Sequence, residues 1–180
     1  MKNKIFALSM AAMSLPASAG ILGQVINFGY EFGGSTSNDA LLVGAGAEIT
    51  CPAGPFNMCT FLTAATSQTV DADDTSITYL YKGSGAGFSI VAGFNGFDFN
   101  GLDAGGNVLG PVMLSTNIVG LDMSRIASTA SSIRIDMESL GVVDGSFFVV
   151  SFGGAAIPEP GTFGLLGASL AALVWRFRQR

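Results

Sequence analysis

The stretch Gln24-Val-Ile-Asn-Phe-Gly-Tyr-Glu-Phe32 places an apolar side chain at every second position from Ile26 onward. Successive side chains of an extended chain point to opposite faces, so this period is typical of a β-strand with one buried face. The residues expected on the buried face are Ile26, Phe28, Tyr30 and Phe32. The segment therefore predicts a half-buried strand.

Similar signals recur along the chain and predict a protein made mainly of strands. The period of two returns at Ile77, Tyr79 and Tyr81, and again at Ile133, Ile135 and Met137. Further strand candidates are Ala40–Thr50, Phe88–Phe94, Val108–Leu114, Ile118–Met123 and Ser146–Phe152. No segment of residues 20–157 has a long helical period, and Ser124–Ser132 could form one turn at most.

Turn-forming dipeptides separate these candidate strands. Asn95-Gly96, Asn100-Gly101 and Asp144-Gly145 tolerate the positive φ angles of tight hairpin turns, and Gly83–Gly87 is expected to be a flexible link. About eight short strands at this spacing predict an all-β fold. We expect a single β-sandwich, jelly-roll-like, with an up-and-down barrel as the alternative.

The N-terminal residues have the three parts of a secretory signal peptide. Lys2 and Lys4 carry positive charge, Ile5–Leu15 is apolar, and Ala17-Ser18-Ala19 is a small-residue cleavage site. We expect a signal peptidase to cleave after Ala19, which makes residues 1–19 a transient export signal.

The C-terminal residues also have three parts. Pro158-Glu159-Pro160 resists incorporation into a helix or sheet, and the uncharged run Gly161–Trp175 follows it. As a helix, this run of fifteen residues would span roughly 22 Å, short of the ~30 Å hydrocarbon core, so it would insert by local thinning of the bilayer. The basic end, Arg176, Arg178 and Arg180, would stay in the cytoplasm. An ordinary anchor or a buried soluble helix is the alternative, although the glycines of the run disfavour a helix in water.

This order of signal peptide, low-charge body, Pro-Glu-Pro, short apolar helix and arginine cluster resembles the PEP-CTERM sorting class of Gram-negative bacteria. The resemblance covers residues 158–180. It implies that an exosortase, a cysteine transpeptidase of the membrane, cleaves near Pro158-Glu159-Pro160 and removes the helix and tail. It also implies export through the inner membrane with a transient anchor, and a mature form at the cell surface or outside the cell. Proteins of this class are often associated with an extracellular polysaccharide matrix or with biofilms.

Between the two signals lies a body of residues 20–157 with a strongly acidic charge balance. It holds three basic residues against twelve acidic ones, a formal net charge of −9. Nucleic acids and anionic lipids require clustered Lys and Arg, so we expect the body to bind neither.

Cys51 and Cys59 are the two cysteines of the chain. In an exported protein an even number of cysteines favours a disulfide. Here the disulfide would close a small loop and stabilise the fold by roughly 2–3 kcal/mol. A redox or metal-binding pair is the alternative, but the spacing is neither that of C-x-x-C nor that of a zinc cluster.

The chain has no histidine, which excludes Ser-His-Asp and Cys-His catalysis and zinc sites that need histidine ligands. A hydrolase that uses two carboxylates remains open, and its candidates are Glu31, Glu48, Asp98, Asp103, Asp136 and Glu138. Oxygen ligands for calcium gather in two loops, at Asp71, Asp73 and Asp74 and at Asp98, Asn100 and Asp103. Neither loop has the pattern of an EF-hand, and turns without a metal are the commoner outcome. We therefore predict no resident cofactor.

Three classes of function remain open for the body. We expect a non-enzymatic structural or adhesive protein of the cell surface or extracellular matrix. The alternatives are a carbohydrate-binding module of the exopolysaccharide matrix and an exported carboxylate-type hydrolase. The aromatic content gives the second class little support, because fourteen Phe accompany only three Tyr and an alternating Phe is usually a core residue.

Overall fold

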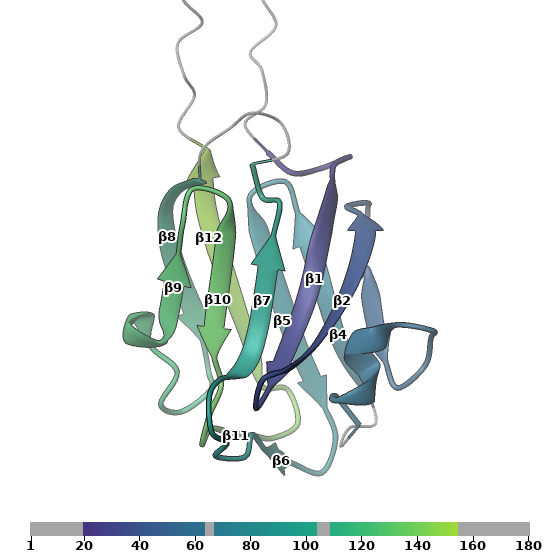
Figure 1. The fold of residues 1–180 in the computed structure, drawn as a ribbon, viewed down its shortest axis with the longest axis vertical. Helices are drawn as coiled ribbons and strands as arrows, with labels where there is room; N and C mark the ends of the chain where they lie inside the picture. The colour runs from purple at the N-terminus through teal and green to yellow at the C-terminus, as the bar shows by residue number, and fades with distance from the viewer. Residues whose placement is uncertain (1–19, 64–66, 104–108, 155–180) are drawn as a thin grey trace, which may run out of the picture. The chain divides into compact units, whose positions relative to one another are not determined.

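Two five-stranded antiparallel sheets pack face to face in the computed structural model, which describes residues 20–63, 67–103 and 109–154 (Figure 1). The first sheet has the order β2-β1-β7-β10-β9. Its strands are β1 (Val25–Phe32), β2 (Ser35–Leu42), β7 (Asn95–Asn100), β9 (Ile126–Ser128) and β10 (Ser132–Asp136). The alternating stretch Gln24–Phe32 thus contains β1, with β2 and β7 on its two sides.

The second sheet has the order β3-β4-β5-β12-β8. Its strands are β3 (Ile49–Cys51), β4 (Ser67–Asp73), β5 (Ser76–Lys82), β8 (Leu109–Thr116) and β12 (Phe147–Gly154). A two-stranded ribbon joins β6 (Ala86–Gly87) to β11 (Gly141–Val142) at one end of the sandwich (Figure 1). Two short 3-10 helices lie outside the sheets, η1 (Asn57–Thr60) and η2 (Met123–Arg125).

The path of the chain confirms the predicted β-sandwich. A hairpin, β1–β2, begins the first sheet, and a meander, β3–β4–β5, begins the second. From β7 onward the chain alternates between the sheets, as in a jelly roll: β7 in the first, β8 in the second, β9 and β10 in the first, and β12 in the second. The strands form two separate sheets and not the single closed sheet of the barrel alternative.

The core lies between the sheets, and the period-two patterns predict its faces correctly. Ile77, Tyr79, Tyr81, Ile133, Ile135 and Met137 are each 0% exposed, as are Ile26 and Phe28. Phe32 is the exception, with 39% of its surface exposed at the end of β1. All buried apolar side chains of the described core fall between Ile21 and Phe152, so the body contains the whole of this core.

Phe97 of β7 lies where the two sheets meet. Its ring centroid is 5.0 Å from that of Tyr79 on β5 and 5.4 Å from that of Phe148 on β12, both in the opposite sheet. Burying an aromatic side chain contributes roughly 1.5–3 kcal/mol, and each ring pair adds about 0.5–1.5 kcal/mol. Contacts of this kind across the core hold the sheets together.

The Asn95-Gly96 dipeptide is not the predicted turn, because both residues lie inside β7. The segment predicted as a strand before it, Phe88–Phe94, is a loop. A Cβ atom on Gly96 would lie 2.0 Å from the backbone oxygen of Ile135 on β10. Glycine is therefore needed here because two strands approach closely. The sequence alone does not distinguish this use of glycine from its use in a hairpin turn.

Two other predicted strands are also wrong. Ala40–Thr50 is interrupted between β2 and β3, where Glu48 accepts hydrogen bonds from the backbone N–H groups of Gly44 (2.9 Å) and Ala72 (2.7 Å). Residues 118–122 form a loop in which Gly120 has a φ angle of +86°, and Met123 begins η2. The hydrogen bonds of Glu48 in the first segment, and the positive φ angle of Gly120 in the second, prevent the extended strand that the apolar composition predicts.

The other two predicted turns have the expected positive φ angles, but they do not join neighbouring strands of one sheet. Gly101 and Gly145 have φ angles of +82° and +77°. The strands on either side of each lie in different sheets, so neither turn closes a hairpin. The predicted link Gly83–Gly87 includes the short strand β6.

Membrane insertion was predicted only for Gly161–Trp175, which lies outside the described residues. Within residues 20–63, 67–103 and 109–154, no helix has the length and apolar character needed to cross a membrane.

The tight approach at Gly96 gives a direct test of the sheet pairing. We expect Gly96→Ala to lower the free energy of unfolding of residues 20–157 by about 3 kcal/mol or more, because the added methyl overlaps backbone atoms of β10. Gly44→Ala is the matched control, since a Cβ there meets nothing within 4 Å, and should change stability by less than about 1 kcal/mol. Urea unfolding measures both, and equal effects would contradict the register of β7 and β10.

Candidate functional site

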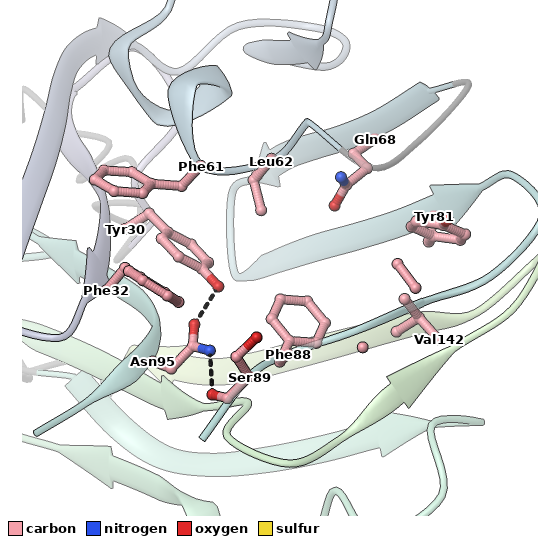
Figure 2. A pocket seen from close by; sticks show the side chains of 12 residues that line it. Tyr30, Phe32, Phe61, Leu62, Gln68, Tyr81, Phe88, Ser89, Asn95 and Val142 are labelled. Carbon is pink, nitrogen blue, oxygen red and sulfur yellow. Dashed lines mark hydrogen bonds between the residues drawn. The ribbon is translucent and has the colours of Figure 1, made fainter. Parts of the chain in front are cut away.

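A pocket of about 140 Å³ opens at the end of the sandwich that carries the β6–β11 ribbon (Figure 2). Its walls come from β1, β4, β5 and β7 and from the segments that follow η1 and β6. These segments are far apart in sequence, and the two-sheet fold brings them together. No Asp, Glu, Lys or Arg side chain is among the residues that line the pocket.

Aromatic rings form one wall of this pocket. Tyr30 stacks on Phe61 with ring centroids 5.8 Å apart and lies 6.5 Å from Phe88. Phe32 stacks on Phe61 at 6.2 Å. Tyr30 is nearly buried by these contacts, so the exposed aromatic surface of the pocket comes from Phe32, Phe61 and Phe88, against which a ring-shaped ligand can pack.

Polar side chains without formal charge complete the lining. The Tyr30 hydroxyl donates a hydrogen bond to Asn95 Oδ1 (2.5 Å), and Asn95 Nδ2 donates to the backbone oxygen of Ser89 (2.7 Å; Figure 2). The Tyr79 hydroxyl donates to Gln68 Oε1 (2.5 Å). These bonds fix the orientation of both amide groups, because each amide oxygen is already used as an acceptor.

Burial keeps the phenol of Tyr30 neutral. Desolvation raises the pKa of Tyr30 above its usual range, since the charged phenolate is disfavoured away from water. The hydroxyl therefore remains a donor to Asn95 at physiological pH, and the pocket stays uncharged.

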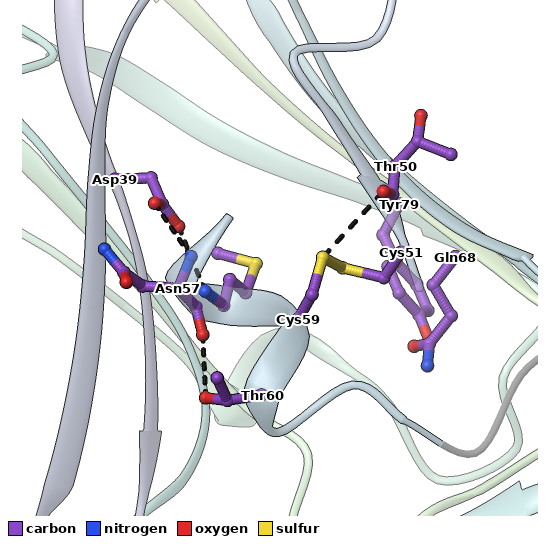
Figure 3. The surroundings of a disulfide bond; sticks show 9 residues. Asp39, Thr50, Cys51, Asn57, Cys59, Thr60, Gln68 and Tyr79 are labelled. Carbon is purple, nitrogen blue, oxygen red and sulfur yellow. Dashed lines mark hydrogen bonds between the residues drawn. A yellow bond between two sulfur atoms is a disulfide. The ribbon is translucent and has the colours of Figure 1, made fainter. Parts of the chain in front are cut away.

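The Cys51–Cys59 disulfide, as predicted, ties the end of β3 to η1 (Figure 3). Phe61, which follows η1 directly, is one of the stacked rings of the pocket. The disulfide thus holds in place a segment that forms part of the pocket wall.

Asp39 on β2 fastens the same segment from the other side. This nearly buried carboxylate accepts hydrogen bonds from the backbone N–H groups of Asn57 (2.9 Å) and Met58 (3.0 Å) at the start of η1 (Figure 3). Hydrogen bonds to a charged acceptor are stronger than those between neutral groups. The covalent bond and the carboxylate together fix how η1 sits against the first sheet.

The candidate carboxylates of the hydrolase alternative lie elsewhere, mostly around Arg134 on β10 and Arg125 at the end of η2. Arg134 pairs with Glu31 (2.6 Å) and Asp98 (3.9 Å), and its guanidinium lies 4.1 Å from the ring centre of Phe94. The Arg134 side chain is only partly buried, so these pairs contribute modestly to stability.

Arg125 contacts Asp136, the last residue of β10, and Glu138, which follows the strand. Its NH1 group lies 3.6 Å from Asp136 Oδ2 and donates to the backbone oxygen of Glu138 (2.9 Å). Glu138 Oε1 accepts from the backbone N–H of Val91 (2.8 Å). The structure therefore gathers Glu31, Asp98, Asp136 and Glu138 near two arginines, whereas Glu48 caps a loop and Asp103 lies in the turn after β7. The hydrolase alternative stays a prediction.

The calcium candidates occupy two separate places. Asp71 and Asp73 lie on β4 with Asp74 in the turn after it, and Asp98 and Asn100 lie on β7 ahead of Asp103. Over the described ranges, no three Asp, Glu, Cys or His side chains are grouped closely enough to hold a metal ion. Calcium binding stays an untested prediction.

The sorting signals lie outside the described residues. They are the signal-peptide residues Ala17 and Ala19, the processing tripeptide Pro158-Glu159-Pro160, and the terminal Arg176, Arg178 and Arg180. Of these signals, only the C-terminal one is covered by the comparison with known families, and cleavage after Ala19 stays a prediction.

Residues 156–179 match the family model described as the PEP-CTERM protein-sorting motif. No curated protein and no solved structure is detectably similar to the chain. The motif defines a PEP-CTERM protein, which is exported, anchored at a membrane by its C-terminal segment before processing, and sorted by an exosortase to the cell surface.

Sequence reasoning missed the pocket because its residues carry no shared local pattern. Phe88 was predicted as part of a strand and Asn95 as part of a turn, whereas both line the pocket. The sequence held one indication of the pocket. Phe61 and Phe88 do not belong to a clear period-two pattern, so the pattern does not assign them to the core.

The Asp39 contact predicts a measurable loss of stability. Asp39→Asn should lower the free energy of unfolding by about 1–3 kcal/mol, because the amide replaces a charged double acceptor with a group that has only one accepting oxygen. Asp73→Asn, at an exposed position on β4, is the control and should cause no loss. If urea unfolding gives equal values for the two variants, Asp39 does not fasten η1.

Replacing Asp71 should raise the free energy of unfolding, whereas replacing Asp39 should lower it. Burial, and then the neighbouring charge of Asp73, raise the pKa of Asp71. The folded state therefore favours the protonated form, so the stability contributed below the unfolded pKa is lost as pH rises through the folded pKa. At pH 7 Asp71→Asn should raise the free energy of unfolding by up to about 0.5 kcal/mol.

The pH dependence provides the control for Asp71. Its gain should shrink towards about pH 3, where the carboxyl is largely protonated in both states. Asp122→Asn should behave oppositely, because hydrogen bonds from Ser124 lower the pKa of Asp122. A gain for Asp71→Asn that does not depend on pH would refute an electrostatic cause.

Proposed function

We propose that the mature body is a non-enzymatic structural or adhesive component of an extracellular, polysaccharide-containing matrix. The observation that carries this proposal is the PEP-CTERM motif at residues 156–179, attached to a small sandwich closed by a disulfide. Proteins that act outside the cell must hold their fold in an oxidising environment, and a disulfide suits that setting. The acidic charge of the body keeps it soluble and repels nucleic acids and other polyanions.

The pairing of the acidic side chains fits a role without catalysis. Glu31 and Asp98 face Arg134, and Asp136 faces Arg125. A pair of catalytic carboxylates needs a shared substrate cleft and different protonation states. Each of these carboxylates is instead engaged by an arginine, so we assign them to stabilising the outer face of the first sheet.

A carbohydrate-binding module is the second candidate, and the aromatic pocket favours it. Flat rings beside fixed amide groups are the kind of lining that sugar rings can contact. This second candidate is compatible with the first, because an adhesive protein of a matrix needs a surface that holds a polymer.

Processing at the C-terminal signal tests the sorting step. In a host with an exosortase, replacing Pro158-Glu159-Pro160 by three alanines should leave a longer form in the membrane fraction, because the processing enzyme loses its recognition site. The unaltered protein should appear as a shorter form in the cell-surface or matrix fraction. Intact mass and fractionation measure both outcomes.

The matched control is the same pair of proteins in a host that lacks the exosortase, where both should remain long and membrane-bound. Maturation of the triple-alanine variant to the mass of the unaltered protein would refute processing at this signal. Release of the mature form into the medium, with none held by the matrix, would refute the structural or adhesive role.

A further inference from the structure

We propose that the aromatic pocket binds one neutral pyranose unit at the end of an uncharged glycan chain. This inference rests on the proposed role in a polysaccharide matrix and names the ligand of that role. The size of the pocket, its aromatic lining, its hydrogen-bond donors and its lack of charge support this ligand.

The size of the pocket limits the occupant to a single ring. Its volume of about 140 Å³ is close to that of a cavity of about 150 Å³ that holds benzene. Pockets for larger ligands measure about 300–1,000 Å³. A chain of several sugars therefore does not fit inside, whereas one terminal ring does.

The ring faces of the pocket suit the C–H face of a pyranose. Tyr30, Phe61 and Phe88 come from three different segments and present stacked or tilted rings to the same space (Figure 2). Such faces pack against apolar C–H groups and exclude water from them. Tyr30 is held in its orientation by its bond to Asn95, so this wall is formed before a ligand arrives.

The polar groups of the pocket require a ligand with oxygen acceptors. Asn95 Oδ1 and Gln68 Oε1 already accept bonds from Tyr30 and Tyr79. Each side-chain amide has two N–H donors, and Asn95 uses one of them for Ser89. The remaining donors, with the Ser89 hydroxyl, are the groups that sugar hydroxyl oxygens can satisfy.

The same features exclude two other kinds of occupant. A purely apolar ring would remove water from these donors without offering them an acceptor, at a cost of about 1–3 kcal/mol for each donor. An acidic sugar would bring a carboxylate to a lining that has no Lys or Arg, in a body of net charge −9. A neutral ring that carries hydroxyl groups is the occupant that meets both conditions.

The test uses residues 20–157, which contain the whole described core, and titrates them with three probes followed by amide chemical shifts. The probes are neutral methyl hexopyranosides, methyl glucuronide and cyclohexanol. We expect a neutral hexopyranoside to bind at millimolar concentration and to shift the amide groups of Gln68 and Asn95. The methyl glucuronide and cyclohexanol should bind at least roughly tenfold more weakly.

Variants locate the binding. Phe88→Ala should weaken binding of the neutral sugar by roughly tenfold or more, whereas Phe94→Ala, a matched half-buried Phe outside the pocket, should leave it unchanged. Ser89→Ala, at an exposed position, should weaken it by a few-fold. Thermal melting confirms that each variant is folded.

Several outcomes would overturn the inference: no binding of any neutral hexopyranoside, tighter binding of the glucuronide or of cyclohexanol, or equal losses in Phe88→Ala and Phe94→Ala. The matrix fractionation described above remains independent of this result. A mature protein that stays in the matrix but binds no neutral sugar would refute the ligand alone. A sugar-binding body that the matrix does not retain would refute the proposed function and leave the pocket intact.

Discussion

The contact of the Phe97 ring with Tyr79 and Phe148 across the two sheets is the interaction on which the rest of the structure depends. Tyr30, the neighbour of Phe97 on β1, packs edge-on against it at 5.2 Å. Tyr30 is also part of the pocket wall, through Phe61 and Phe88. The core and the candidate binding site therefore share one residue, and any change in the spacing of the sheets would change the pocket.

Charge is distributed in a way that separates these two parts of the molecule. The acidic side chains near Arg125 and Arg134 lie on the first sheet, away from the neutral lining of the pocket. Asp39 lies apart from these pairs: it is nearly buried, and its carboxylate accepts hydrogen bonds from two backbone N–H groups of η1. A neutral pocket in an acidic body gives selectivity against polyanions without a basic residue in the site.

The sequence was sufficient to predict the class of fold, because alternation at Ile26–Tyr30 and Ile133–Met137 directly reflects burial on one face. It also predicted the disulfide and the sorting motif, which depend on local spacing. It misplaced β7, since a glycine that permits close strand pairing at Gly96 looks like a turn residue. The pocket could not be predicted, because Gln68, Phe88 and Asn95 meet only through the order of strands in two sheets.

The most direct measurement of the central claim is an aromatic NOESY spectrum of the exported body. The packing predicts cross-peaks between the rings of Phe97 and Tyr79, which lie in different sheets, and between those of Tyr30 and Phe88 at the pocket. A folded protein that shows neither set would contradict the two-sheet arrangement. Cross-peaks for the first pair without the second would keep the sandwich and remove the pocket.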